Sequence, residues 1–385
     1  SRPLQAAGRE PPSMKNILLL LLTGLVAVAI TAWVRYGGGQ PYPDMTSAPL
    51  LREDELQKVL SYPLPVGNVA VSRTGRVFFT VHPEARPKGN RLLEYVNGAA
   101  VPYPGMRQQA ELFDTVLGVA IDRQGKLWTI DHGNHGTRSA RLLAFDIDTG
   151  KVVHDHRLPA EIAPAGSFLQ DLQISADGRT IIIADASFWR KRPAIIVYDV
   201  ESATARRVLE SHPSVAAENY VIAHGDAEMR FFGGLVSLRG GVDGIALGPE
   251  WLYYGALSGS TLYRVRLRDL RDPELPAGQL ARRVESYSTK PLSDGLSIDV
   301  DGNVYITDVE HNAVFVVGND RELRTLVRSP RVRWPDALSF GPDGWLYVAD
   351  SALQEVVLRP EEHVEENGPY GIFRFRPGTE GVPGQ

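Results

Sequence analysis

A short phrase recurs along this chain and limits its fold more than any other feature. In each copy an acidic or polar residue begins an apolar strand, a glycine-containing turn follows, and a second apolar strand ends in polar residues. The clearest copies begin at Asp243-Gly244, Asp294-Gly295 and Asp336-Ala337. A repeat of roughly 40–50 residues built from short strands is typical of a β-propeller, in which every innermost strand lines one central channel.

The turns between paired strands set the number of repeats. Asp301-Gly302 and Asp343-Gly344 are the strongest of these turns, because glycine adopts a positive φ without a Cβ clash between two apolar runs. We therefore predict an all-β fold, a six-bladed β-propeller over residues 50–378. Its inner strands are expected to start near Gly67, Leu117, Gln170, Asp243, Asp294 and Asp336.

The last blade is short of one strand, because the sequence ends soon after residues 371–375. The segment 56–62, ahead of blade one, can supply the missing outermost strand. That pairing would close the ring and leave no open sheet edge. Outside the propeller we expect an N-terminal extension with a signal or anchor at 1–36, a linker at 37–49 and a tail at 379–385.

The stretch from His212 to Gly241 fits no blade. It lies between blades three and four and contains Phe231-Phe232-Gly233-Gly234. Long loops within compact domains tend to be functional. We therefore interpret this stretch as an insertion that covers one face of the propeller as a lid.

An apolar segment near the N-terminus indicates the compartment. Residues 17–34 carry no charge and follow Lys15, and they are long enough to span a bilayer marginally. Small residues at Ala27, Ala29 and Ala32 also give this segment the form of a cleavable secretory signal. The positive residue ahead of it places the N-terminus inside, so we expect the propeller outside the cytoplasm, secreted or periplasmic.

The sequence before that segment has a separate interpretation. Met14-Lys15-Asn16 followed by a run of leucines resembles the normal start of an exported protein. We therefore expect Ser1 to Ser13 to lie upstream of the natural start.

Composition excludes several classes of function. The chain has 385 residues, a formal net charge of −5 and no cysteine. A weakly acidic chain without a basic stripe is unsuited to nucleic acid, and the lack of cysteine removes disulfides, thiolate zinc sites and cysteine nucleophiles. We expect a monomer whose partner is a small-molecule ligand, and which contacts a membrane only through an uncleaved N-terminal segment.

Propeller topology brings distant polar residues together, because inner strands start and second strands end at the same mouth of the channel. Asp243, Asp294 and Asp336 occupy one repeat position, so we expect their carboxylates to face one another. Carboxylates gathered in a narrow channel must protonate, pair or bind a cation. Hard oxygen ligands favour Ca²⁺, so these three residues are the candidate metal ligands and Ca²⁺ is the expected cofactor.

Two other interpretations of these acidic residues stay open. An Asp at a strand start often caps a turn through its own backbone. Arginines could neutralise the ring instead of a cation, and Arg138, Arg190 and Arg333 are near enough in sequence to do so.

Further polar and aromatic residues are expected at the same mouth. Asp294 and His311 are the candidate catalytic residues; His311 follows a strand end in Asp308-Val309-Glu310-His311-Asn312, and a hydrogen-bonded structural histidine is the alternative. His132 belongs to a glycine-rich loop at 132–136 that a plain flexible loop would also explain. The candidate substrate-binding residues are Asn68, Asp171, His132, Trp189 and Asn312.

The phrases quoted above carry a family resemblance. Gly241-Val242-Asp243-Gly244, Ser293-Asp294-Gly295-Leu296, Asp308-Val309-Glu310-His311-Asn312 and Arg333-Trp334-Pro335-Asp336 together resemble the major royal jelly/yellow family in its bacterial branch, over roughly residues 50–376. The resemblance implies a six-bladed propeller that is usually exported. Family members include pigment-pathway proteins, binders of small amines and proteins described as related to dopachrome tautomerase.

A more distant resemblance is to the gluconolactonase/senescence-marker family, whose members hold one divalent metal with a Glu, Asn residues and an Asp. Gly67-Asn68 stands here where those enzymes have the Glu. Three functions therefore stay open: a metal-assisted hydrolase acting on a lactone or similar ester, a non-catalytic binder of a small amine or aromatic ligand, and an isomerase acting on an oxidised catechol.

Overall fold

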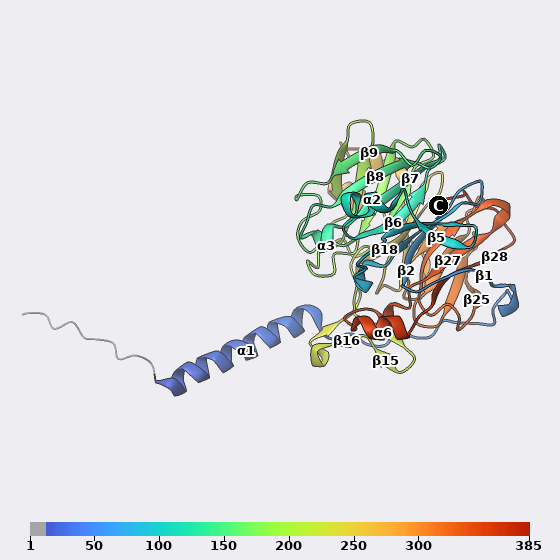
Figure 1. Cartoon of the computed structure of the whole chain (residues 1–385). Helices are drawn as coiled ribbons and strands as arrows, with labels where there is room; N and C mark the ends of the chain where they lie inside the picture. The colour runs from blue at the N-terminus through green and yellow to red at the C-terminus, as the bar shows by residue number, and fades with distance from the viewer. Residues whose placement is uncertain (1–12) are drawn as a thin grey trace, which may run out of the picture.

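Six four-stranded antiparallel sheets form a ring around one central channel in the computed structural model, which describes residues 13–385 (Figure 1). The inner strand of each sheet contacts the inner strands of the sheets on either side. The six-bladed propeller predicted from the repeat is confirmed. The expectation about Ser1 to Ser13 falls almost wholly on residues 1–12, which lie outside the described residues.

The strands of the first three blades follow one another in chain order from the inside outward. Blade one is β2 (Val66–Val71), β3 (Val77–Val81), β4 (Leu92–Val96) and β5 (Ala99–Pro102); blade two is β6 (Val116–Ile121), β7 (Lys126–Asp131), β8 (Arg141–Asp146) and β9 (Val152–Arg157); blade three is β10 (Leu169–Ile174), β11 (Thr180–Asp185), β12 (Ala194–Asp199) and β13 (Thr204–Val208).

Blades four and five repeat this order, and blade six takes its outermost strand from the other end of the chain. Blade four is β18 (Val242–Leu247), β19 (Trp251–Ala256), β20 (Thr261–Arg266) and β21 (Glu285–Thr289); blade five is β22 (Leu296–Ile298), β23 (Val304–Asp308), β24 (Ala313–Val317) and β25 (Leu323–Arg328); blade six is β26 (Pro335–Phe340), β27 (Leu346–Asp350), β28 (Tyr370–Phe375) and β1 (Gln57–Tyr62).

Strand β1 closes the ring as predicted. It pairs antiparallel with β28, and Leu60 lies opposite Ile372 in the register. Leu60 is 4% exposed and belongs to a core cluster that spans blades one and six. The pairing of a strand from the start of the propeller with strands from its end therefore holds the two ends together through backbone hydrogen bonds and apolar packing.

The glycine that follows the leading Asp of the repeat allows neighbouring blades to approach closely. A Cβ on Gly244 would lie 2.1 Å from the carbonyl oxygen of Asp294, and one on Gly295 would lie 2.5 Å from that of Asp336. No side chain fits at these distances. The Asp-Gly pairs at the strand starts are thus a packing requirement of the ring as well as a repeat signature.

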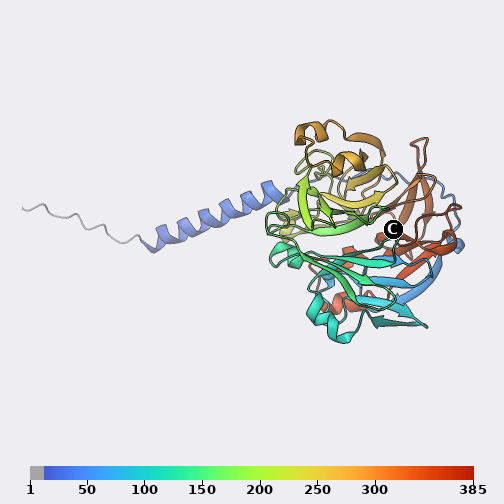
Figure 2. The ribbon, with the colours of Figure 1, turned by 90° about the horizontal axis from the view of Figure 1, so that it is seen from above.

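The two ends of the channel are covered by different parts of the chain. Helix α1 (Met14–Tyr36), helix α6 (Glu361–Glu366) and the insertion lie on one side of the propeller (Figure 1). The insertion folds into two small hairpins, β14–β15 (Ala223–His224 and Ala227–Glu228) and β16–β17 (Arg230–Phe231 and Val236–Ser237). Seen from above, the last residue, Gln385, lies at the centre of the ring (Figure 2).

The linker and the insertion hold each other in place at this mouth. Gln40 forms a parallel bridge with Tyr220, and the guanidinium of Arg230 donates to the carbonyl oxygens of Gly38 and Gly39 at 2.7 and 2.9 Å. At the other end of the channel, the N–H of Ile121 donates to the carbonyl oxygen of Gly384. Residues near both ends of the sequence therefore complete the two faces of the propeller.

Truncating the packed residue of the closing strand should weaken the whole ring. We expect Leu60→Ala to lower the free energy of unfolding by about 2–5 kcal/mol, because it leaves a cavity in the core. Leu50→Ala is the control, since Leu50 is 60% exposed, and should change that free energy by less than about 0.5 kcal/mol. Urea unfolding followed by tryptophan fluorescence measures both; equal effects would show that closure does not depend on packing at β1.

Candidate functional site

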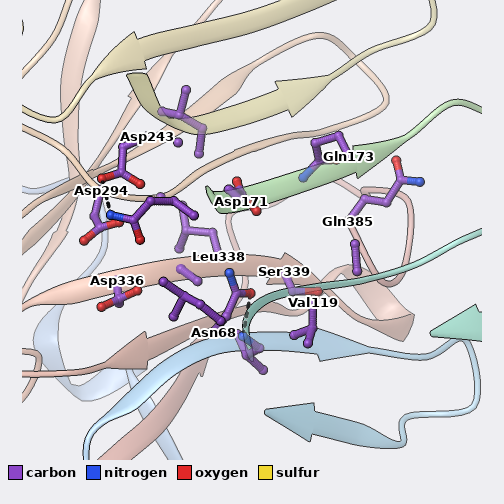
Figure 3. A pocket seen from close by; sticks show the side chains of 18 of the residues that line it. Asn68, Val119, Asp171, Gln173, Asp243, Asp294, Asp336, Leu338, Ser339 and Gln385 are labelled. Carbon is purple, nitrogen blue, oxygen red and sulfur yellow. Dashed lines mark hydrogen bonds between the residues drawn. The ribbon is translucent and has the colours of Figure 1, made fainter. Parts of the chain in front are cut away.

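Four carboxyl groups face the channel from the starts of four inner strands. Asp171, Asp243, Asp294 and Asp336 come from blades three to six and converge with Asn68 of blade one (Figure 3). Local register explains why they point inward: the pairing between β18 and β19 shifts between Val242 and Ile245, at the position of Asp243, and the first strands of blades one, two, three and six carry the same irregularity. Bulges of this kind re-aim side chains.

The Asp243 and Asp294 carboxyls form a proton-sharing pair. They hydrogen-bond each other, the Gln170 amide donates to Asp243 Oδ2 at 3.0 Å, and the Trp334 indole N–H donates to Asp294 Oδ2 at 2.8 Å. Burial raises the pKa of Asp294 to about 7, and burial together with the neighbouring Asp294 raises the pKa of Asp243 well above its ordinary value. Two carboxyls this close hold a proton between them at neutral pH.

A buried lysine lies close to this pair. The Lys290 side chain is fully buried, and its ammonium donates to Ser293 Oγ at 2.9 Å and to the carbonyl oxygen of Pro291 at 3.0 Å. Burial lowers the pKa of Lys290 to about 7, although Asp243 and Asp294 act in the opposite direction. With its pKa near 7, Lys290 is a tethered amine that carries its charge only part of the time at neutral pH, and that charge partly balances the channel carboxyls.

Asp336 and His82 form a second polar pair. Burial and the neighbouring Asp294 raise the pKa of Asp336 well above its ordinary value, whereas burial lowers the pKa of His82 to about 4. His82 is thus neutral at pH 7, so the 3.8 Å separation between its Nε2 and Asp336 Oδ2 is not an ion pair. His82 Nδ1 accepts the N–H of Glu84, which leaves the imidazole proton on Nε2, aimed at an Asp336 oxygen that has no partner among the described residues.

The carboxylates at the ends of the second strands accept backbone N–H groups from neighbouring loops and do not line the channel. Asp131 accepts N–H groups from Asp114 and Thr115, and Asp350 accepts those of Arg333 and Trp334. Asp185 and Asp308 bind loop N–H groups in the same manner. Asp131, Asp185 and Asp350 thus fix the loops that lead into the inner strands, and Asp308 fixes the turn from β23 to β24. This is the capping role left open for acidic residues in the sequence.

Arginines neutralise the strand-end carboxylates and do not reach the channel pair. Arg333 binds Asp350 at 2.7 Å, and Arg207 binds Asp185 at 2.8 Å. Arg138 and Arg190 pair with Asp114 and Glu210 instead. The channel carboxyls are therefore left with protonation, hydrogen bonds and Lys290.

The channel itself is too narrow for an organic ligand. Its free volume is about 20 Å³, which is room for a water molecule. The Gln385 side chain closes the far end and donates to the carbonyl oxygen of Ile174 at 3.0 Å (Figure 3). Any organic ligand must therefore approach the carboxyls from the opposite mouth.

A larger apolar cavity of about 270 Å³ lies at that mouth. Asp294 and Gln170 line both this cavity and the channel, so they form the polar floor that the two spaces share. The insertion contributes part of the wall, consistent with the predicted lid position. The apolar lining comes chiefly from Phe168, Phe188, Trp189, Phe231, Leu238 and Leu257.

A carboxylate and a histidine form one polar patch in this apolar wall. His135 Nε2 and Glu84 Oε1 are 2.9 Å apart, and the His135 ring stacks on Phe168 with centroids 4.5 Å apart. Burial favours protonation of Glu84, but the hydrogen bond to His135 and the nearby histidines outweigh it and lower the pKa of Glu84 below its ordinary value. Glu84 is therefore ionised at neutral pH.

The structure brings some of the predicted substrate-binding residues together and separates others. Asn68 and Asp171 line the channel, and Trp189 lines the apolar cavity. His132 is buried behind the cavity, where its ring packs edge-on against Phe168 with centroids 4.6 Å apart. Asn312 is held in a left-handed conformation with φ 59° and lies outside the linings of both spaces.

His311 also lies outside both linings. Its Nδ1 is 3.0 Å from Asp308 Oδ2, and its Nε2 faces Asp44 of the linker at 3.8 Å. The Asp308 hydrogen bond raises the pKa of His311. Through these contacts His311 helps to attach the linker to the propeller. The catalytic role predicted for His311 stays a prediction.

Sequence reasoning missed His82, Glu84 and Lys290. A register signal for His82 was present, since Val66 pairs with Val81 in blade one as Val116 pairs with Asp131 in blade two. His82 therefore occupies the repeat position of His132. Lys290 had no such signal, because its position beside the channel depends on the loop that joins β21 to β22.

The residues at the channel do not fit a metal centre. Within residues 13–385 no three His, Asp or Glu side chains are arranged to hold a metal ion. Asp243 and Asp294 are also engaged with each other and with the N–H donors of Gln170 and Trp334, and N–H donors take the oxygen positions that a cation needs. The Ca²⁺ expected from the sequence is untested, and these contacts weigh against it.

The fold and the acidic channel define a class: six-bladed propellers that present polar side chains at one mouth. Two solved structures resemble the chain in fold. A luciferin-regenerating enzyme aligns with a TM-score of 0.57 and 12% identity over 86% of this chain and 97% of its own. A gluconolactonase from Xanthomonas campestris aligns with a TM-score of 0.51 and 14% identity over 83% of this chain and 88% of its own. At these identities the likeness establishes the fold alone.

The sequence comparison is more specific. The profile of the family described as Major royal jelly protein matches residues 114–359, more than half of the chain. This chain belongs to that family, as the resemblance of its repeat phrases predicted. It is 25% identical over 219 residues to Major royal jelly protein 3 of Apis mellifera, a match covering 54% of this chain and 38% of that protein. The chain thus matches less than half the length of that relative.

The buried carboxyls should make stability depend on pH. The folded state holds the Asp294 proton up to about pH 7, whereas the unfolded chain releases it near pH 4. The free energy of unfolding therefore falls as pH rises from about 4 to 7. Asp294→Asn cannot lose a proton and should flatten this slope by up to about 1.4 kcal/mol per pH unit.

Urea unfolding of wild type and Asp294→Asn at several pH values measures the difference. His82, whose pKa shift acts in the opposite direction, contributes to both proteins and cancels in the comparison. Asp54→Asn is the control, because the Asp54 side chain is exposed, and should keep the wild-type slope. Parallel slopes for Asp294→Asn and wild type would contradict a protonated Asp294.

Calcium binding can be tested directly. Because the channel carboxyls are paired with each other and with N–H donors, we expect no calorimetric heat and no rise in unfolding temperature when millimolar Ca²⁺ is added at pH 7. Micromolar binding that Asp243→Asn abolishes would restore the calcium hypothesis.

Proposed function

We propose that this protein binds a small aromatic amine in the apolar cavity at the mouth of the channel. The observation that carries the proposal is an ionised carboxylate, Glu84, in a cavity walled by Phe168, Phe188 and Trp189. His135 Nε2 already lies 2.9 Å from Oε1 of that carboxylate, so a ligand ammonium would join an existing polar pair, and aromatic walls favour both ring stacking and a cation.

The size and floor of the cavity support a ligand of this kind. About 270 Å³ is at the lower end of the range for ligand pockets, which suits a single-ring compound. Asp294 and Gln170 at the floor offer hydrogen bonds to a ring hydroxyl. With Glu84 in the wall and Asp294 at the floor, the pocket can orient a ligand that has a polar group at each end.

Proton-transfer catalysis on such a ligand is a second candidate, and one observation favours it. Asp294 reaches the cavity and has its pKa raised to about 7 by burial, which is the range in which a general acid or base works best at neutral pH. The isomerase implied by the family resemblance would use this group. Asp294→Asn should then keep ligand affinity and lose turnover of an oxidised catechol.

Metal-assisted hydrolysis has weaker support. The acidic ring motivates it, but a hydrolase of this type needs a cation to polarise the ester carbonyl, and the described carboxyls offer no ligand set for one. We derive no hydrolytic step from the channel residues.

Calorimetry against single-ring aromatic amines and their matched alcohols tests the binding function. We expect the amines to bind, and Glu84→Gln to weaken them at least tenfold, or about 1.4 kcal/mol, while leaving the alcohols unchanged. Glu361→Gln is the charge-matched control, since Glu361 is exposed and pairs with Lys88 outside the cavity. Leu238→Trp should fill the cavity and abolish binding of both sets.

Two results would contradict this proposal. One is the failure of every amine to bind the wild-type protein. The other is equal loss of amines and alcohols in Glu84→Gln, which would mean that the carboxylate supports the pocket and does not recognise charge.

A further inference from the structure

The apolar helix α1 ends beside the mouth of the ligand cavity. The Tyr36 hydroxyl donates to the carbonyl oxygen of Trp189 at 2.8 Å, and the Arg35 guanidinium donates to that of Arg190 at 2.8 Å. The Tyr36 ring packs edge-on against Trp189 with centroids 5.7 Å apart. Trp189 also lines the cavity, so one residue joins the end of the helix to the cavity wall.

The rest of α1 is not packed into the propeller. None of its residues is buried, and it projects away from the domain in both views (Figures 1 and 2). Its 23 residues have a mean hydropathy of 2.6 over the most apolar window, and a helix of that length spans roughly 35 Å, enough to cross a bilayer core of about 30 Å. Residues bound to the last turn of a spanning helix lie at the membrane surface.

The side chains around that last turn are of the types found at membrane surfaces. Tyr36 of the helix packs against Phe188 and Trp189 of the propeller. Trp33, three residues earlier in the helix, is exposed, and Arg35 is the basic residue of the last turn. Tryptophan and tyrosine concentrate at the level of lipid headgroups, and basic side chains reach the phosphates there.

The lips of the cavity are apolar and exposed. Phe232 of the insertion is 65% exposed, and Leu358, which lines the cavity from the segment after β27, is 53% exposed. Trp189, which is 38% exposed, also lines the cavity, and Phe232 directly follows the lining residue Phe231 in the chain. Exposed apolar groups clustered on one face mark a contact surface. Because the apolar helix α1 ends beside this face, we infer that the surface contacts lipid.

We propose that the cavity mouth rests on the bilayer surface, with Phe232, Leu358 and Trp189 in the lipid interface, so that ligand enters from the membrane. The amine identity of the ligand rests on the proposed function, but the orientation does not. An amphipathic aromatic amine concentrates in the interface, where its ring is buried and its charge stays hydrated. The opening thus meets the ligand where its concentration is highest.

Because the sequence contains no cysteine, an introduced cysteine is the only thiol that a dye can label. The variants F232C and L358C place one thiol each at the mouth, and R123C places one on an exposed turn beside Ile121, at the far end of the channel. Each full chain is labelled with an environment-sensitive nitrobenzoxadiazole dye and inserted into phosphatidylcholine nanodiscs. A zwitterionic lipid is used because α6, which follows Leu358, carries four glutamates.

We expect dyes at positions 232 and 358 to shift their emission to the blue and to be quenched at least twofold by headgroup-proximal spin-labelled lipid, with position 123 unchanged. Equal quenching at all three positions, or none at the mouth, would overturn the orientation. Mass spectrometry of the exported protein is a second test of the orientation, because loss of α1 by cleavage would also overturn the orientation. Amine calorimetry in the same nanodiscs is scored separately: quenched mouth dyes without amine binding would refute the proposed function and leave the orientation standing.

Discussion

Desolvation of carboxyl groups in the central channel is the constraint on which the rest of the site depends. Ring closure brings four aspartates from four blades to one narrow space. Their mutual repulsion and burial are tolerable only because protons are retained and because Trp334, Gln170 and Lys290 lie close by. If the ring loosened, water would enter the channel and the aspartate side chains would ionise. The stability of the fold and the protonation of these carboxyl groups are therefore coupled.

The same residue type does two tasks in neighbouring layers of the propeller. Asp350 at a strand end is bound by backbone N–H groups and by Arg333, and these contacts offset part of the burial that raises its pKa. Asp294 at a strand start accepts one indole N–H and faces another carboxyl, and it keeps a proton. Hydrogen-bond donors, more than position in the repeat, decide which aspartates are structural supports and which are available for proton chemistry.

The insertion and the N-terminal segments make the two mouths of an otherwise repetitive fold different from each other. They cover only one mouth, where Phe231 and Leu238 complete an apolar cavity above the acidic floor. Propellers of this class carry many activities on one framework, and the family relationship does not choose among them. The combination of a carboxylate, aromatic walls and neutral acids at the floor is what favours an amine ligand here.

Much of the fold was determined by the sequence alone. The period of the repeat, the Asp-Gly turns and the missing outer strand predict six blades and closure by residues 56–62, because side-chain alternation and turn geometry are local. The same register predicts that Asp243, Asp294 and Asp336 converge. Only the tertiary structure decided the rest: His311 turned to the linker, Glu84 and Lys290 entered the site, and the end of α1 reached Trp189. Loop paths set these contacts, and a loop path depends on the packing of residues distant in sequence, which no local pattern encodes.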